Sequence, residues 1–183
     1  MSTGLLVIDV QNDYFAGGRM EVPGSSECAE RVAELLAAFR RAGSPVLHLQ
    51  HLSIRPGATF FIPGTSGAEI HPTAAPRAGE PIFQKHFPNG FRETGLLDAL
   101  RDAGVDRLVV CGMMTQMCVD ATTRAAFDLG LRCDVAHDAC AARPMTFGGR
   151  VVAAPDVHAA FLGALASVYA RVAPTADIVA ATG

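Results

Sequence analysis

The chain has 183 residues, half of them apolar and 18% charged, with a formal net charge of −3. This length and balance are typical of one globular domain over residues 1–183 and exclude an intrinsically disordered chain. The small negative charge gives no electrostatic reason to expect nucleic acid or an anionic membrane as a partner, and no apolar run is long enough to span a bilayer.

The cysteines and the N-terminal residues indicate in which cellular compartment the protein is expected. An odd number of cysteines without a CxxC pair argues against a disulfide framework or a zinc ribbon. The N-terminal residues, MSTGLLVIDVQNDYF, have no basic region before the apolar run, so we expect no signal peptide. We therefore expect a cytoplasmic protein with free thiols at Cys28, Cys111, Cys118, Cys133 and Cys140.

The first predicted element is a strand over residues 5–10, LLVIDV, whose continuous apolar run is typical of a central parallel strand. Asp9 stands at its carboxyl end, where α/β sheets place their chemistry, although a plain turn-forming role is equally compatible. Apolar residues at helical spacing then predict a helix that begins after Gly24 and ends at Gly43.

The second predicted strand covers residues 45–50 and has His48 and His51 near its end. Residues three apart on a strand point to opposite faces, so these histidines make a poor chelating pair, and we expect no metal there. We interpret one of them as a core residue and the other as a rim residue.

Residues 52–80 form a long irregular segment rich in proline and glycine. A segment of this length inside a domain is usually functional, so we predict a lid or a pocket wall. Phe60 and Phe61 either cover a site or pack the segment down.

The third predicted strand, residues 81–85, ends in Lys85. An ammonium at the end of an apolar strand is costly unless it pairs with a carboxylate or contacts water, and an ordinary solvated lysine is the alternative. A helix over residues 94–103 and a fourth strand over residues 106–112 are expected to follow.

Residues 109–130 read as a buried strand, a tight turn and a helix that carries Cys118 in its first turn and runs to Phe127. A helix N-terminus lowers the pKa of a thiol, which favours a reactive Cys118. The alternative is a small apolar residue that packs the helix against the sheet.

The last predicted elements are a strand over residues 131–135, a short helix or turn over 138–143, a helix from Pro155, and an edge strand over 176–180. Strands that alternate with helices predict right-handed βαβ units and a parallel sheet with helices on both faces. In such a sheet Asp9, Lys85 and the turn before Cys118 all lie at one edge.

Three stretches, LLVIDVQNDYF (5–15), FQKHFPNGF (83–91) and CGMMTQMCVDATTRAAFDLG (111–130), together resemble the isochorismatase-like cysteine hydrolases. This superfamily includes nicotinamidase, N-carbamoylsarcosine amidase and ureidoacrylate amidase. The resemblance covers nearly the whole chain and implies a six-stranded, Rossmann-like three-layer α/β fold. It also implies an Asp9–Lys85–Cys118 triad and a cis peptide bond from Met113 to Met114, which would turn the Met114 N–H toward the site beside the Cys118 N–H.

The chain departs from the nicotinamidases at one point. They resemble one another in an Asp-x-His…His metal cluster after the second strand, where this chain has HLQHLSIRPG without a carboxylate. We therefore expect neither a metal nor a cofactor. Residues 60–72 are more similar to the metal-free members, of which streptothricin hydrolase is an example.

These expectations combine into a functional hypothesis. Asp9 takes the proton of Cys118, whose sulfur attacks a carbonyl, while Lys85 stabilises the anions and the N–H groups of Met114 and Cys118 form the oxyanion hole. The predicted reaction cleaves a C–N bond of a small, largely uncharged amide, lactam or carbamoyl compound through an acyl thioester. Our candidates for the substrate pocket are Gln50, Phe60, His86, Phe91 and Gln116.

Other functions stay open at this point. Vinyl-ether hydrolysis of the isochorismatase type needs no thiol nucleophile, and a thiol redox protein needs a resolving cysteine that the sequence does not reveal. A binding or assembly subunit on the same fold is a further alternative. We also expect a homo-oligomer, a dimer or tetramer, because the last two helices carry more apolar surface than one sheet face requires.

Overall fold

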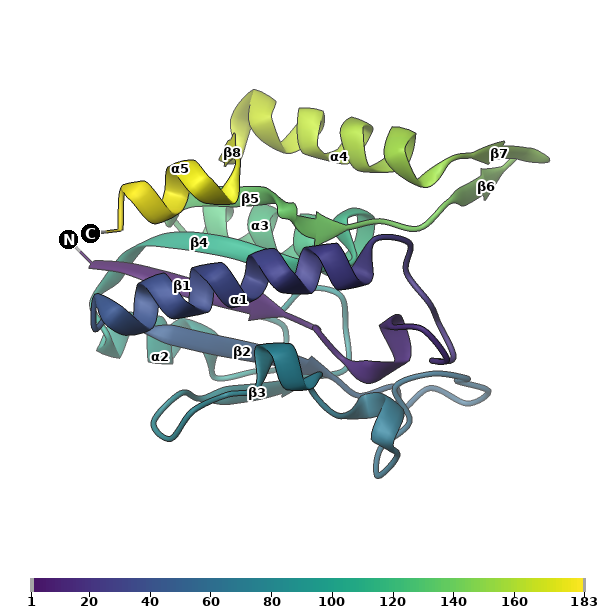
Figure 1. The fold of residues 1–183 in the computed structure, drawn as a ribbon, viewed down its shortest axis with the longest axis horizontal. Coiled ribbons are helices and arrows are strands. Elements are labelled where there is room, and N and C mark those ends of the chain that lie inside the picture. Colours follow the sequence, from purple (N-terminus) through teal and green to yellow (C-terminus); the bar gives the residue numbers. More distant parts are fainter. Residues whose placement is uncertain (1, 183) are drawn as a thin grey trace.

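The central sheet contains six parallel strands in the order β3-β2-β1-β4-β5-β8 (Figure 1). The computed structural model describes residues 2–182. Within this range the strands are β1 Ser2–Ile8, β2 Val46–His51, β3 Ile82–Lys85, β4 Val105–Met113, β5 Arg132–Ala141 and β8 Arg171–Ala173. The predicted six-stranded parallel sheet is confirmed.

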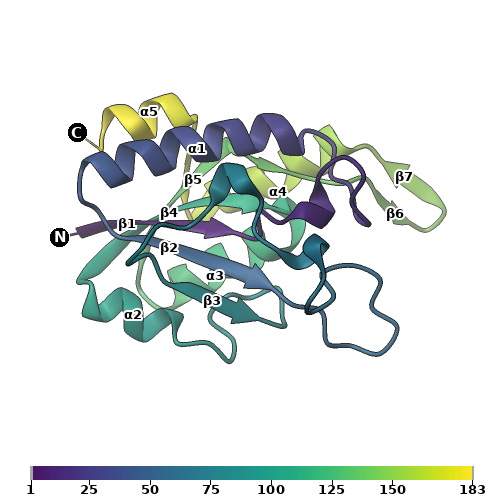
Figure 2. The same ribbon diagram turned by 60° about the horizontal axis from the view of Figure 1, so that its bottom comes forward.

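Helices cover both faces of this sheet. They are α1 Ser25–Arg41, α2 Leu96–Asp102, α3 Asp120–Asp128, α4 Ala154–Val168 and α5 Thr175–Ala180. The helices α1 and α5 pack on one face, and α2, α3 and α4 pack on the other (Figures 1 and 2). The predicted three-layer arrangement is therefore confirmed.

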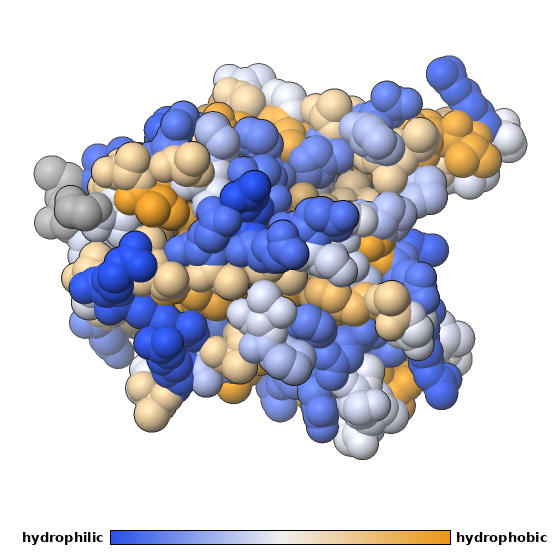
Figure 3. Space-filling model, in the orientation of Figure 1, coloured by the Kyte–Doolittle hydropathy of each residue, from blue (hydrophilic) through white to orange (hydrophobic). Residues whose placement is uncertain are grey.

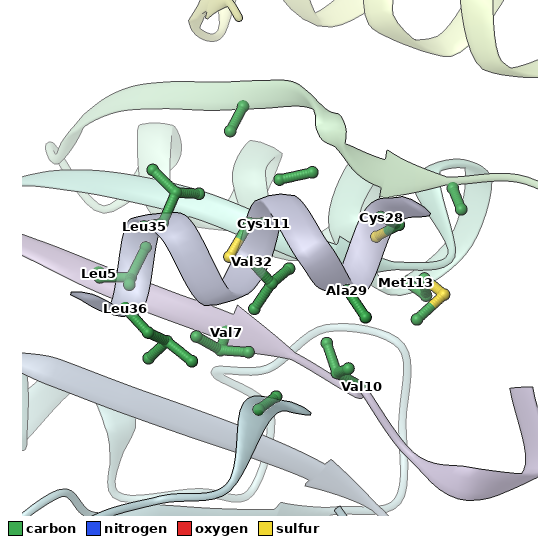
Figure 4. Close-up of a cluster of buried hydrophobic side chains, with 14 of the residues drawn as sticks. Leu5, Val7, Val10, Cys28, Ala29, Val32, Leu35, Leu36, Cys111 and Met113 are labelled. Atoms are coloured by element: carbon green, nitrogen blue, oxygen red, sulfur yellow. The ribbon is translucent and has the colours of Figure 1, made fainter. Parts of the chain in front are cut away.

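The apolar periodicity of α1 fixes how it packs. Its buried residues recur three and four positions apart, so they form one stripe that faces β1 and β4. Figure 4 shows Val32 and Leu36 of α1 beside Leu5 and Val7 of β1, in the same buried cluster. This layer holds β1 rigidly, and Asp9 is the first residue after that strand.

The prediction of a helix or turn over residues 138–143 is wrong, because β5 continues to Ala141. The register shifts inside this strand: Val110 pairs with Val135 and Gly112 pairs with Cys140, so β4 advances two residues while β5 advances five. The small residues from Ala139 onward carry little β-propensity, but they are buried beside β4 and complete its ladder.

The edge strand predicted over residues 176–180 is also wrong, since this stretch belongs to α5. The edge strand is β8, just before it. Thr175 begins α5 and donates hydrogen bonds from both its N–H and its hydroxyl to Asp138 Oδ1, each 2.7 Å long. This contact, together with burial of Ile178 against the α1 layer, stabilises the helix.

A two-stranded hairpin, β6 Met145–Phe147 and β7 Arg150–Val152, projects from the body between β5 and α4 (Figure 1). Its turn is Gly148-Gly149, and both glycines have positive φ, as a tight hairpin turn requires. This Gly-Gly pair was a sequence signal for a hairpin that we did not predict. Over residues 2–182 the longest apolar helix falls short of a membrane span.

Candidate active site

Three reactive side chains from distant parts of the chain meet at the carboxyl edge of the sheet. Asp9 follows β1, Lys85 ends β3, and Cys118 lies in the turn after β4. Lys85 Nζ is 2.7 Å from Asp9 Oδ2 and 3.3 Å from Cys118 Sγ. These distances confirm the predicted convergence of the three residues. The cluster is buried, because the exposed fractions are 0% for Asp9, 1% for Lys85 and 5% for Cys118.

Asp9 is held by its backbone in an unusual conformation. Its φ is +49°, a left-handed value that aspartate tolerates better than most residues. Its N–H donates to the Leu49 carbonyl at 3.1 Å, and its own carbonyl accepts from the Gln11 N–H at 3.0 Å. The Oδ1 atom is buried without a hydrogen-bond partner in the described part of the chain, so this oxygen is free to accept a proton.

Lys85 is a buried ammonium surrounded by acceptors. Burial lowers the pKa of this amine, but the negative charge of Asp9 and the hydrogen bonds to Asp9 and Cys118 outweigh burial and raise it above its ordinary value. Besides Asp9 and Cys118, Nζ lies 3.1 Å from His51 Nδ1 and 3.2 Å from the Phe87 carbonyl. Lys85 therefore stays charged and points its N–H groups into the cluster.

Cys118 lies in a π-helical turn, Thr115–Val119, that leads directly into α3. Here our expectation of a lowered thiol pKa is wrong: burial raises the pKa, the Asp9 carboxylate raises it further, and Lys85 only partly opposes them. The resting sulfur is therefore a protonated thiol. Desolvation outweighs the favourable field of a helix N-terminus.

The backbone before this turn has the cis peptide bond that the resemblance implied. The peptide bond between Met113 and Met114 is cis. Gly112 has a φ of +114°, and a Cβ at this position would lie 2.0 Å from the Ile8 carbonyl oxygen. Only glycine fits so close to β1. No hydrogen bond of the Met114 N–H is found within residues 2–182, which leaves this donor available.

Buried polar side chains tie the segment over residues 52–80 to the end of β1. Gln11 Nε2 donates to the carbonyls of His51 and Ala68 at 2.9 and 2.7 Å. Asp13 Oδ2 accepts from the Phe61 N–H at 2.6 Å. Phe61 is fully buried, whereas Phe60 is half-buried. The segment is thus fastened beside the cluster, where a pocket wall was predicted.

Two of the predicted pocket residues, Gln116 and Phe60, lie on segments that adjoin the triad, and their role in substrate binding stays a prediction. Gln116 is two residues before Cys118, and its Oε1 is buried without a partner among the described residues. Phe60 packs on Tyr14, whose pKa is raised by burial and by the charge of Asp9. Tyr14 also packs on Phe61, with ring centroids 4.6 Å apart, and so joins the QNDYF stretch to the segment over residues 52–80.

The other three predicted pocket residues make contacts with the scaffold. Gln50 Nε2 donates to the Ala68 carbonyl at 2.9 Å, and the His86 ring lies 2.9 Å from the Leu52 carbonyl. Phe91 packs against the apolar core on the α2 face. A role of these residues in substrate binding stays a prediction.

His51 is the site residue that the sequence analysis missed. It is paired with Lys85 in the β2–β3 ladder, so both side chains leave the sheet edge together. The strand-end argument that identified Asp9 and Lys85 applies equally to His51. His48, by contrast, is a core residue whose Nε2 lies 3.1 Å from Glu80 Oε2, so one histidine is in the core as predicted.

The cluster contains donor types that suit zinc. One ligand atom each from Asp9, His51 and Cys118 lies within 4.8 Å of the others. However, Lys85 Nζ contacts all three of these residues, so its ammonium occupies the place of a shared cation. His48 is engaged with Glu80, and the residues present do not fit the metal cluster of nicotinamidases.

The sequence matches the family model described as the Isochorismatase domain over residues 3–177. The isochorismatase family protein YddQ of Bacillus subtilis is 46% identical over 175 residues, covering 96% of this chain and 97% of that relative. A streptothricin hydrolase of Streptomyces noursei is 40% identical over 163 residues, which are 89% of this chain and 56% of the relative's length.

Solved structures agree with this match. A protein from Oleispira antarctica described as an isochorismatase hydrolase has a TM-score of 0.94 at 48% identity, covering 98% of this chain and 96% of its own. The N-carbamoylsarcosine amidase of Thermoplasma acidophilum has a TM-score of 0.81 at 26% identity, covering 96% and 97%. The nicotinamidase of Escherichia coli is 28% identical over 173 residues, covering 74% of this chain and 81% of the relative.

Proposed function

Because the chain belongs to the isochorismatase family, we propose that it is a cysteine hydrolase that cleaves a C–N bond of a small amide, lactam or carbamoyl compound. The observation that carries this proposal is the buried contact of Lys85 with both Asp9 and Cys118. Two relatives, the nicotinamidase and the N-carbamoylsarcosine amidase, bear the names of amidases, which favours an amide over other substrates.

In the first half of the proposed reaction the Cys118 sulfur attacks the substrate carbonyl carbon. Because the resting thiol is protonated, its proton must leave during the attack, and the unpartnered Asp9 Oδ1 is the base that receives it. The tetrahedral intermediate then collapses, and Asp9 gives the same proton to the departing nitrogen. An amine or ammonia leaves, and an acyl thioester remains on Cys118.

In the second half water takes the place of the thiol. Asp9 accepts a proton from the water while the oxygen attacks the thioester carbonyl, and the collapse of this intermediate expels the Cys118 thiolate. The proton on Asp9 returns to the sulfur, and the carboxylic or carbamic acid leaves. Throughout both halves the Lys85 ammonium offsets the negative charge that moves between Asp9 and Cys118.

The oxyanion of each intermediate is assigned to the backbone N–H groups of Met114 and Cys118. The Met114 N–H has no partner within residues 2–182, which supports this assignment. Preorganised donors of this kind stabilise the charge that develops on the carbonyl oxygen, and loss of one donor typically costs about 10²–10³-fold in rate.

The proposal is tested with a panel of small primary amides, lactams and carbamoyl compounds, scored by release of ammonia or amine. Hydroxylamine and intact-mass measurement are used to trap the acyl group. We expect turnover of at least one compound class and an acyl adduct on the Cys118 peptide. Turnover of isochorismate without an adduct, or thiol oxidation without hydrolysis of any compound, would contradict the proposal.

The alternatives receive less support from the site. Vinyl-ether hydrolysis uses no thiol, so it does not account for the contact between Cys118 and Lys85. A redox role needs a partner thiol, but the side-chain contact of Cys118 Sγ is with the Lys85 ammonium.

We keep two further expectations as proposals. Exposed apolar residues on the hairpin, Met145, Phe147 and Val151, support a homodimer or homotetramer (Figure 3). Sedimentation velocity measures this directly, and a monomer at micromolar concentration would contradict it. The free state of all five cysteines supports a reducing cytoplasm as the compartment, which fractionation of the source cells would test.

A further inference from the structure

The Lys85 ammonium has more acceptors than it has N–H groups. Four acceptors lie within 3.3 Å of Nζ: Asp9 Oδ2, His51 Nδ1, the Phe87 carbonyl and Cys118 Sγ. An ammonium donates only three hydrogen bonds. One acceptor is therefore always without an N–H from Lys85, and the protonation state of the sulfur decides which.

In the resting state the sulfur is the weakest of the four acceptors, and its 3.3 Å distance from Nζ is the longest. A protonated thiol is a weak acceptor, and burial keeps the Cys118 pKa raised. The three N–H groups then match Asp9, His51 and the Phe87 carbonyl. When the thiol loses its proton, the sulfur becomes a charged acceptor, and one N–H has to turn toward it.

His51 has the right chemical form for this arrangement. Burial lowers its pKa to about 4, an effect that Lys85, His86 and Arg55 reinforce and Asp9 opposes. The ring is therefore neutral near pH 7. Because lysine only donates, the atom that faces Nζ must carry the lone pair, so Nδ1 is the acceptor and Nε2 carries the hydrogen.

The backbone of His51 is held firmly in place. Its N–H donates to Gln11 Oε1 at 2.8 Å, and its carbonyl accepts from Gln11 Nε2 at 2.9 Å. Gln11 is fully buried, and His51 is also paired with Lys85 in the strand ladder. A ring on such a support can define where the ammonium lies.

We propose that His51 is a positioning residue, whose neutral imidazole holds one N–H of Lys85 and keeps the ammonium between Asp9 and Cys118. This inference rests on the proposed cysteine hydrolase function. As the thiol proton passes to Asp9, the N–H of Lys85 that faces the Phe87 carbonyl turns to the sulfur, while His51 Nδ1 keeps its own N–H and Lys85 keeps all three of its protons. His51 acts through Lys85 and exchanges no proton with the substrate.

The first test compares His51→Ala with His51→Asn. The amide oxygen of asparagine reaches nearly the place of Nδ1, so it can accept the same hydrogen bond. We expect His51→Ala to lower kcat about 10–100-fold, the usual loss when a supporting hydrogen bond is removed, with little change in KM. His51→Asn is expected to recover most of kcat. His137→Ala, a half-buried histidine on β5, is the control and is expected to stay within about twofold of the wild type.

The second test needs no substrate. Iodoacetamide labelling of Cys118 is followed by peptide mass spectrometry at a fixed pH, because the alkylation rate depends on the thiolate that Lys85 stabilises. We expect labelling about 10-fold slower in His51→Ala, equivalent to a thiol pKa about one unit higher, and near wild-type labelling in His51→Asn. His51→Leu keeps side-chain bulk without an acceptor and replaces His51→Ala if that variant does not fold.

Labelling of His51→Ala that is unchanged or faster, with kcat within threefold of the wild type, would overturn the proposal. Equal losses in His51→Asn and His51→Ala would overturn it too, because the acceptor would then not matter. If Cys118→Ala retains hydrolysis, the proposed function fails on its own, and the labelling comparison still reports how His51 positions Lys85.

Discussion

Asp9 Oδ2 and Lys85 Nζ form a 2.7 Å ion pair between residues 76 positions apart in the sequence, and the side chains of both are fully buried. Neither charge reaches water, so each depends on the other for its solvation. Folding therefore brings a carboxylate and an ammonium into the interior as one unit, next to the Cys118 thiol.

The first prediction concerns this pair. Lys85→Met leaves the Asp9 carboxylate buried without its cation, so we expect a loss of about 3–5 kcal/mol in the free energy of unfolding. The double variant Asp9→Asn with Lys85→Met removes both charges, and it should recover most of that stability. Urea denaturation at pH 7 measures both.

A hydrolysis assay separates the loss of the reaction from the loss of stability. The double variant should fold well and still lack turnover, because the base and the ammonium are both gone. A double variant as unstable as Lys85→Met alone would show that the pair is not coupled in folding.

The second prediction concerns the nucleophile. Cys118→Ala should lower kcat/KM by at least about 10³-fold, since loss of a nucleophile removes the covalent route and leaves only binding and oxyanion effects. Cys133→Ala is the control, because this buried cysteine on β5 lies outside the triad. Steady-state kinetics of both variants are measured on an amide of the compound class that the wild type hydrolyses. Full turnover by Cys118→Ala would contradict the mechanism.

The third prediction concerns the backbone before the nucleophile turn. Gly112→Ala places a Cβ 2.0 Å from the Ile8 carbonyl at a φ of +114°, so we expect a loss of several kcal/mol or failure to fold. Gly163→Ala in α4 is the matched control, since a Cβ there meets nothing within 4 Å. It should be neutral or stabilising by up to about 1 kcal/mol. Thermal unfolding of both variants tests the contrast, and equal midpoints would contradict it.

The fourth prediction concerns pH. Burial alone would raise the Glu80 pKa, but its hydrogen bonds from Arg40, from the Arg77 N–H and from His48 outweigh burial and lower it to about 2. The ordinary pKa of this carboxyl is about 4.5. The stabilisation is therefore fully present above pH 4.5 and is lost as the pH falls toward 2.

Glu80→Gln should thus be less stable than the wild type at pH 7, and the difference should shrink between pH 4.5 and 2. The control is Glu34→Gln, which removes an exposed pair with Arg31 and should change stability by less than about 1 kcal/mol at any pH. Urea titrations at several pH values measure the trend. A difference between Glu80→Gln and wild type that does not depend on pH would contradict the assignment.

Much of the fold could be predicted because its signals are local. Continuous apolar runs marked β1, β2 and β4, and apolar spacing marked α1 and α4. The errors fell where local signals are weak. The small residues at the end of β5 gain their strand conformation from pairing with β4, and α5 depends on a contact of Thr175 with Asp138.

The sequence by itself determined that an acid, an amine and a thiol stand at strand ends, because parallel strands bring their carboxyl ends to one edge. Only the tertiary structure decided their chemical states. Burial makes Cys118 a protonated thiol, leaves one Asp9 oxygen unpartnered and brings neutral His51 to Lys85. Desolvation and hydrogen-bond partners come from residues far apart in the chain, so no local pattern of residues contains them.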